Sequence, residues 1–179
     1  GPAARIVATG GQLATGSYGS DQVLIRAVGV YVDGSLAHTL ISDALATVRV
    51  VVDFNAAFTD PHIGFQLRNK RGEAVFMTHT HGMGQSIGPV AAGQSVQVDF
   101  AFKLILAPGE YTVTAGVAEA GVGEGAVQTS LARVHDAFGF SVARNPYGIA
   151  WNGGCHPAPE SMIQRATAAS TAPAYSCSS

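Results

Sequence analysis

Apolar and polar residues alternate with a period of two along much of this chain, between glycine-containing turns, and this alternation limits the folds that it can adopt. In VQVDFAF, for example, Val96, Val98, Phe100 and Phe102 fall on one face of an extended strand, because successive side chains of a strand point to opposite faces. Similar runs, rich in Val, Phe, Tyr and Thr, predict strands at residues 23–33, 48–54, 63–69, 74–81, 96–106, 111–118 and 132–142, and an earlier one within 5–13.

The connections between these runs point to one class of fold. Turn dipeptides separate the strands, and the body of the chain has no sustained helical period; only residues 159–168 resemble a short helix. Seven or eight strands without crossover helices predict an all-β fold, an antiparallel β-sandwich, with a barrel as the structural alternative. The predicted core residues are Val50, Val52, Phe65, Leu67, Val98, Phe100, Tyr111, Val113 and Phe140.

The chain is expected to hold one domain between two peripheral segments. Its 179 residues suit a single core. Residues 1–15 are interpreted as a tag remnant and N-terminal lead, 16–143 as the sandwich, and 144–179 as a tail rich in Pro, Ala and Ser. Cys155 and Cys177 both lie in that tail, so the sandwich is not expected to depend on a disulfide, and a reducing compartment is favoured. No apolar run reaches membrane-spanning length.

Charge and motifs argue against several function classes. The formal net charge is −2, with 10 basic and 12 acidic residues, which disfavours binding to duplex nucleic acid. The chain has no phosphate-binding loop of the G-x-x-x-x-G-K-[ST] type, no G-x-S-x-G nucleophile motif and no evident pair of facing carboxylates. We therefore expect this chain not to be an enzyme and to need no cofactor.

His79 and His81 form an H-x-H pair at the end of a predicted strand. Alternate side chains of a strand share one face, which is a geometry that metal ligands use, but a metal site needs a third or fourth ligand. His135, Asp136 and His156 could supply one only through folding, and no spacing predicts it. The sequence therefore predicts no metal, and the two histidines are interpreted as polar residues at a strand end.

The remaining candidate site is a polar sheet face that bears Arg49, Gln66, Arg68, Thr112 and Thr114. If Phe65, Leu67, Tyr111 and Val113 point inward, the last four of these point outward on one sheet. Such a face is often merely solvated. The functional interpretation is carbohydrate binding, since amides and guanidinium groups on a rigid sheet match sugar hydroxyls with little ordering cost. His79 and His81 would extend the face, and Arg68 is the strongest candidate for vicinal hydroxyls or an anionic cap.

Four stretches resemble one family, in the order in which that family has them. They are GSYGSDQVLIRAVGVYVDG, HIGFQLRNKRGEAVFMTHT, VDFAFKLILAPGEYTVTAGV and ARVHDAFGFSV. Together they resemble the C-terminal carbohydrate-binding domain of Wzt-type proteins, the ATPase subunits of bacterial O-antigen ABC transporters. The match spans residues 16 to 142, and the tail from Arg144 departs from the family pattern.

The resemblance implies an immunoglobulin-like β-sandwich that recognises the non-reducing end of a finished, lipid-linked polysaccharide before export. It implies a place in the cytoplasm, at the inner face of the inner membrane, with the ATPase in an upstream domain absent from this chain. It also implies a homodimer in which the terminal strand can be exchanged, for which the glycine-rich stretch GVGEGAVQTS would act as a hinge. The alternative function is a protein–protein dimerisation or docking sandwich attached to a polysaccharide-modifying enzyme.

Overall fold

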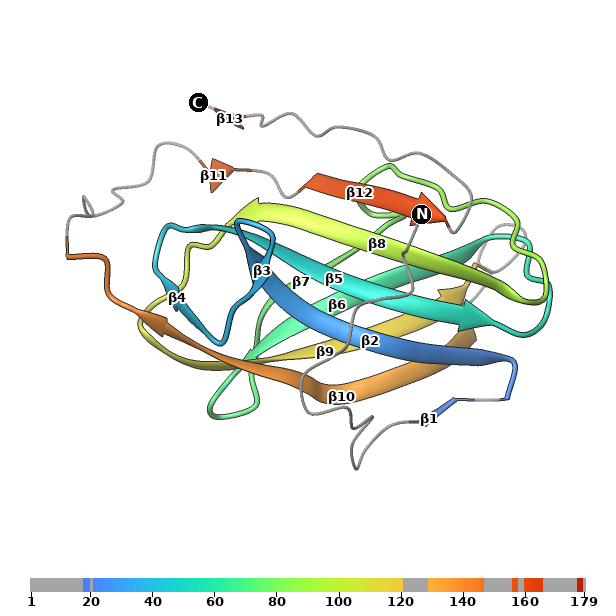
Figure 1. Ribbon diagram of the computed structural model, residues 1–179, viewed down its shortest axis with the longest axis horizontal. Helices are drawn as coiled ribbons and strands as arrows, with labels where there is room; N and C mark the ends of the chain where they lie inside the picture. The colour runs from blue at the N-terminus through green and yellow to red at the C-terminus, as the bar shows by residue number, and fades with distance from the viewer. Residues whose placement is uncertain are drawn as a thin grey trace.

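Two β-sheets packed face to face form the body of the protein (Figure 1). The computed structural model describes residues 21–120 and 129–146 in full, and only the backbone of the strands at 18–19, 156–157, 160–165 and 177–178. The described residues contain no helix, and therefore none long and apolar enough to cross a membrane. The predicted early strand within 5–13 lies outside the described residues.

The first sheet has the strand order β12-β8-β5-β2-β3, and every neighbouring pair is antiparallel. Its strands are β2 (Val23–Val32), β3 (Ser35–Leu36), β5 (Leu45–Phe54), β8 (Gln94–Lys103) and β12 (Glu160–Arg165). A two-residue turn at Asp33-Gly34 joins β2 to β3, and both of its residues have positive φ, 51° and 79°. This is the backbone that a tight hairpin requires, and Asp-Gly adopts it readily.

The second sheet has the order β1-β10-β9-β6-β7. Its strands are β1 (Tyr18–Gly19), β6 (Pro61–Asn69), β7 (Ala74–His79), β9 (Gly109–Glu119) and β10 (Thr129–Ala143), and the short β4 (Thr39–Ile41) pairs in parallel with β10. Two further short strands, β11 (His156–Pro157) and β13 (Cys177–Ser178), pair with each other. With β2, β5 and β8 in one sheet and β7, β6, β9 and β10 in the other, the arrangement is that of an immunoglobulin-like sandwich.

The core between the sheets is the one that the sequence predicts. All nine predicted core residues are buried, from 0% exposure for Val50, Val98 and Phe100 to 8% for Tyr111. Phe65 stands at its centre, where its ring meets the edge of Phe100 at 5.0 Å between centroids. The period of two in the sequence therefore identified the inward faces of both sheets.

The prediction of a short helix in the tail is wrong. Residues 159–168, expected as a short helix, contain the strand β12, whose Ile163 lies opposite Val98 of β8. Helix propensity is a weak preference that tertiary contacts override, and β8 would otherwise present an open edge of backbone hydrogen-bonding groups. The predicted strand 74–81 is also too long, since β7 ends at His79 and His81 lies in the turn that follows.

Tyr111 ties the start of β9 to the loop before it, because its hydroxyl donates a hydrogen bond to the carbonyl oxygen of Ala107 at 2.6 Å. This is the tyrosine corner typical of such sandwiches. Tyr111→Phe should lower the free energy of unfolding by about 0.5–1.5 kcal/mol, since the ring still packs on Phe140 and exposed Ala107 can bond to water instead. Urea denaturation followed by circular dichroism measures this loss, and an unchanged midpoint would show that the bond contributes nothing.

Candidate binding site

The outer face of the second sheet carries the polar residues that the sequence placed there. Strands β6 and β9 are antiparallel neighbours, with Gln66 opposite Thr114 and Arg68 opposite Thr112. Arg49 does not belong to this face, because it lies on β5 of the other sheet, where it pairs with Asp99. The sequence pattern gives which side of a strand a residue occupies but not which sheet the strand joins, and this is why the prediction for Arg49 is wrong.

A hollow of about 380 Å³ lies on this face, above strands β7, β6, β9 and β10. Gly64 and Gly116, which lie opposite each other on β6 and β9, leave its floor without side chains. A Cβ atom at Gly64 would lie 2.6 Å from the carbonyl oxygen of Thr78 and 2.7 Å from the Cβ of His79, so this position requires glycine. The side chains around the floor include those of His62, Gln66, Met77, His79, Thr114 and Arg133.

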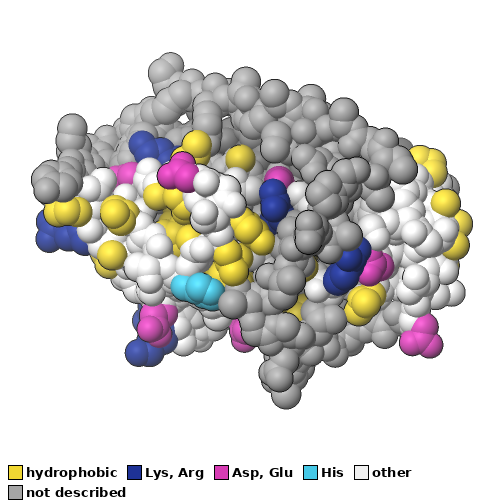
Figure 2. Space-filling model, in the orientation of Figure 1, with side chains coloured by type: hydrophobic (Ala, Val, Ile, Leu, Met, Phe, Trp, Pro, Cys, Tyr) yellow, Lys and Arg dark blue, Asp and Glu magenta, His cyan; other side chains and the backbone are white. Residues whose placement is uncertain are grey.

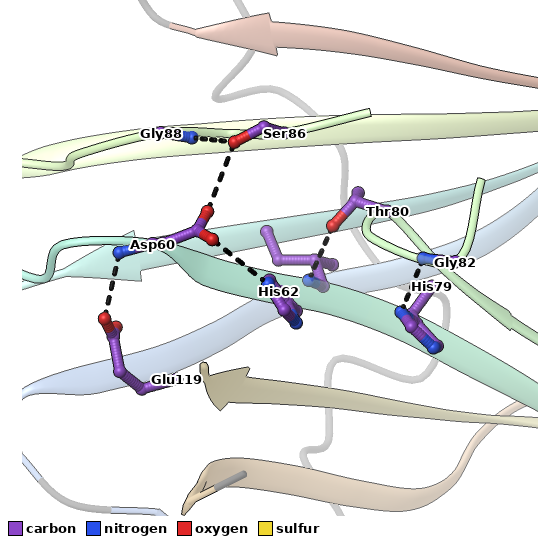
Figure 3. Close-up of polar contacts among 9 residues, drawn as sticks. Asp60, His62, His79, Thr80, Gly82, Ser86, Gly88 and Glu119 are labelled. Carbon is purple, nitrogen blue, oxygen red and sulfur yellow. Dashed lines mark hydrogen bonds and ion pairs between the residues drawn. The ribbon is translucent and has the colours of Figure 1, made fainter. Parts of the chain in front are cut away.

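His79 stands at the edge of the hollow in a fixed orientation. The backbone N–H of Gly82 donates a hydrogen bond to its Nδ1 at 3.0 Å (Figure 3). A ring nitrogen that accepts carries no proton, so the proton of the neutral ring lies on Nε2. Burial lowers the pKa of His79 from its usual value, and the neighbouring His62 and His81 lower it further. His79 is therefore a neutral side chain with one N–H to donate.

His62 lies beside His79 and connects the hollow to the residues before β6. Its ring is stacked on that of His81 at 4.5 Å between centroids and lies 6.1 Å from that of His79. Figure 3 shows Asp60, the residue before β6, directed toward His62, with 3.4 Å between Asp60 Oδ2 and His62 Nε2. The donor atoms of Asp60, His62 and His81 all lie within 4.8 Å of one another.

Arg133 forms the opposite wall of the hollow, on β10. Its Nη2 donates a long hydrogen bond, 3.5 Å, to Oε1 of Gln66. Its Nε is buried and has no hydrogen-bond partner among the described residues. An amide and a guanidinium group thus stand together with donor capacity left over, which suits a polar ligand.

The predicted residues at the far end of the face have other contacts. Arg68 donates from Nε (3.0 Å) and Nη2 (2.6 Å) to the carbonyl oxygen of Gly72, in the turn between β6 and β7. Thr112 donates to Asp136 Oδ1 at 2.6 Å, and the Asp136 N–H donates to Thr114 Oγ1 at 3.0 Å. These bonds hold an irregularity of β10, where Asp136 has a positive φ of 50°.

The structure therefore brings together half of the six predicted site residues. Gln66, His79 and Thr114 line the hollow, whereas Thr112 lines a second hollow of about 520 Å³ next to Asp136. Arg68 and His81 line neither of these two hollows. A ligand role for any of the six stays a prediction.

Sequence reasoning missed His62, Gly64 and Arg133. His62 and Gly64 continue the period of two that includes Gln66 and Arg68, so their signal was present in PHIGFQLRN. Arg133 alternates with the buried Ala132 and Val134. Its place opposite Gly116 becomes evident only once β10 is known to pair with β9.

Comparison with known proteins agrees with this architecture. A crystal structure of the C-terminal domain of Wzt superposes with a TM-score of 0.66 at 17% sequence identity, covering 77% of this chain and 85% of that one. At this identity the likeness shows the fold. The search of curated proteins found no match. The family model described as the Wzt C-terminal domain matches residues 15–155, which is most of the chain. The chain therefore belongs to the Wzt C-terminal domain family.

Proposed function

We propose that this domain binds the non-reducing terminus of a bacterial O-antigen polysaccharide for export by an ABC transporter. The observation that carries the proposal is the glycine-floored hollow on the outer face of β7, β6, β9 and β10. Membership of the Wzt C-terminal domain family supports the same role.

The chemistry of the hollow suits a terminal sugar. A sugar ring presents a flat patch of C–H groups surrounded by hydroxyls. The open floor at Gly64 and Gly116 admits such a ring, and the exposed thioether of Met77 offers it apolar contact. Donors for the hydroxyls come from His79, Gln66 and Arg133. Because these groups stand on paired strands, binding costs little ordering entropy.

The place of the domain in the transporter follows from the same proposal. ATP hydrolysis would belong to an upstream domain, and the present domain would select the finished polymer without catalysing a reaction. Selection before export requires a location in the cytoplasm, at the inner face of the inner membrane.

The test of the proposal is calorimetric titration of the domain with purified O-polysaccharide of the source bacterium. Two samples are compared, one with its natural non-reducing ends and one from which the terminal residues have been removed enzymatically. Saturable binding of the first sample alone is expected. Equal binding of both samples would contradict recognition of the terminus, and binding of neither would contradict the proposal as a whole.

Arg133→Ala should weaken polysaccharide binding by about ten- to a hundred-fold, the effect of losing one charge-assisted hydrogen bond. Arg71→Ala is the matched control, since this arginine is 80% exposed in the turn between β6 and β7. Arg68→Ala tests the far end of the face: a similar loss there would extend the site along β6. Unchanged affinity in Arg133→Ala would exclude the hollow as the site.

A protein-docking role is the second candidate. Ile41, Leu45 and Ile105 are 51%, 56% and 39% exposed, and backbone hydrogen bonds between residues 43–44 and Leu104 bring their segments together at one end of the sandwich. An exposed apolar cluster of this kind is a feature of contact surfaces. We keep the homodimer as a prediction, and light scattering that shows a monomer at micromolar concentration would contradict it. In the structure, β10 pairs with β9 of its own chain.

A further inference from the structure

We propose that Asp60, His62 and His81 form a binding site for a divalent transition-metal ion such as Zn²⁺. The three residues come from two places in the chain, the start of β6 and the turn after β7, which the pairing of β6 with β7 brings together. Their donor atoms all lie within 4.8 Å of one another. Two imidazoles and a carboxylate are a ligand set that zinc uses in proteins.

The spacing between Asp60 and His62 already suits an ion. Ligands about 2.0–2.1 Å from a tetrahedral zinc lie about 3.3–3.4 Å from each other. Asp60 Oδ2 and His62 Nε2 are 3.4 Å apart, which is longer than an ordinary hydrogen bond between such groups. These two atoms can therefore share an ion without a change in their separation.

His81 would complete the site by turning its ring. The rings of His62 and His81 are stacked with only 10° between their planes, so their lone pairs lie in two nearly parallel planes and do not converge on one point. His62 is 5% exposed and held within the sheet, whereas His81 is exposed in a turn. Rotation of the His81 side chain is thus the movement that would aim all three donors at one ion.

The surroundings of Asp60 hold its carboxylate in place for a cation. Ser86 donates its hydroxyl to Asp60 Oδ1 at 3.2 Å, and the Asp60 N–H donates to Glu119 Oε1 at 2.9 Å (Figure 3). The first of these bonds orients the carboxylate, as outer hydrogen bonds do at metal sites, and the second fixes the backbone of Asp60. Within the described residues, neither Asp60 nor Glu119 forms an ion pair with a lysine or arginine, and Glu119 Oε2 is buried without a hydrogen-bond partner. A bound cation would offset this local negative charge.

Three protein ligands leave a coordination position open. His79 is not one of them. Its Nδ1 accepts the hydrogen bond from Gly82, and its Nε2 carries the proton, so neither nitrogen of the neutral ring has a lone pair free for a metal. In the sequence, only the pair His79 and His81 hints at a metal site. Of these two, only His81 belongs to the proposed site, and Asp60 and His62 are its other ligands. His62 also lines the hollow, so the open position would be next to the proposed sugar site.

Zinc titration of the metal-free domain by calorimetry tests the proposal, because it needs no polysaccharide. The wild type is expected to bind Zn²⁺ saturably at this site. His81→Ala and Asp60→Asn should each weaken that binding at least ten- to a hundred-fold, the loss that removal of even an outer hydrogen-bond partner causes. His135→Gln is the matched control, since His135 lies outside the cluster, and it should leave the affinity unchanged.

Three results would overturn the proposal: no saturable binding in the wild type, unchanged affinity in His81→Ala, or an equal loss in His135→Gln. Circular dichroism of each variant shows whether the fold is intact, and His81→Ala, in an exposed turn, is expected to keep it. Because metal alone is the probe, failure here leaves the polysaccharide proposal standing.

Discussion

Phe100→Ala is expected to lower the free energy of unfolding by about 3–5 kcal/mol, the usual cost of truncating a fully buried phenylalanine. Phe100 is 0% exposed, lies on the central part of β8 and packs edge-on against Phe65. Its removal leaves a cavity between two hydrogen-bonded sheets, which can close only if both sheets move. Urea denaturation followed by circular dichroism measures the loss.

Phe76→Ala is the matched control for this experiment. Phe76 is the same residue type and also contacts Phe65, but it is only partly buried, on the edge strand β7. It should therefore cost less than Phe100→Ala. A loss below about 1 kcal/mol for Phe100→Ala would contradict the assignment of this ring to the core.

Arg49→Met is expected to cost a similar amount, about 3–5 kcal/mol, because the buried Asp99 carboxylate loses its ionic partner and keeps only the Gln97 amide, at 3.2 and 3.4 Å. Arg49 binds Asp99 through Nε at 2.6 Å and Nη2 at 2.8 Å, and Asp99 is only 3% exposed. The bond to Asp99 raises the pKa of the Arg49 guanidinium, which also lies 4.6 Å above the ring of Tyr31. Figure 2 shows basic and acidic side chains side by side on this face of the first sheet.

The double variant Arg49→Met/Asp99→Leu distinguishes two causes of the lost stability, the unpaired Asp99 carboxylate and the lost packing contacts of Arg49. Replacing both partners of a buried pair with apolar residues is often close to neutral, so most of the lost stability should return. If the double variant is as unstable as Arg49→Met, packing of the arginine on Tyr31 explains the loss instead. If Arg49→Met itself costs under about 1 kcal/mol, water reaches Asp99 and the pair behaves as a surface ion pair.

The sequence predicted the core because burial follows directly from the alternation of side chains along a strand. It could not predict the burial of Gln97 and Asp99, which lie on the outer face of β8, away from the core. Each of them is only 3% exposed. Their burial depends on what packs over the outer face of the sheet, and no local pattern records that. The helix expected at 159–168 failed for a related reason, since the open edge of β8 determines the backbone there.

The candidate site was predictable only in part for the same reason. Periodicity placed Gln66 and Thr114 on one face, and the structure confirms that they are opposite each other. The hollow, however, depends on Gly64 meeting Gly116 and on β10 bringing Arg133 alongside. These are relations between strands that are distant in sequence. Likewise, Asp60 and His81 are close because β6 pairs with β7, and residue types alone do not reveal it.

Strand β12, which belongs to the tail, covers a sheet edge through which copies of the protein could otherwise associate. Along β8 it satisfies backbone groups from Val96 to Ala101. A shortened chain that ends at Ala143 would lack that strand and would expose those groups as a template for a strand from any neighbouring molecule. A strand from another copy of the protein could then pair with β8 in place of β12. Removal of β12 would therefore favour association of copies through this edge of the first sheet.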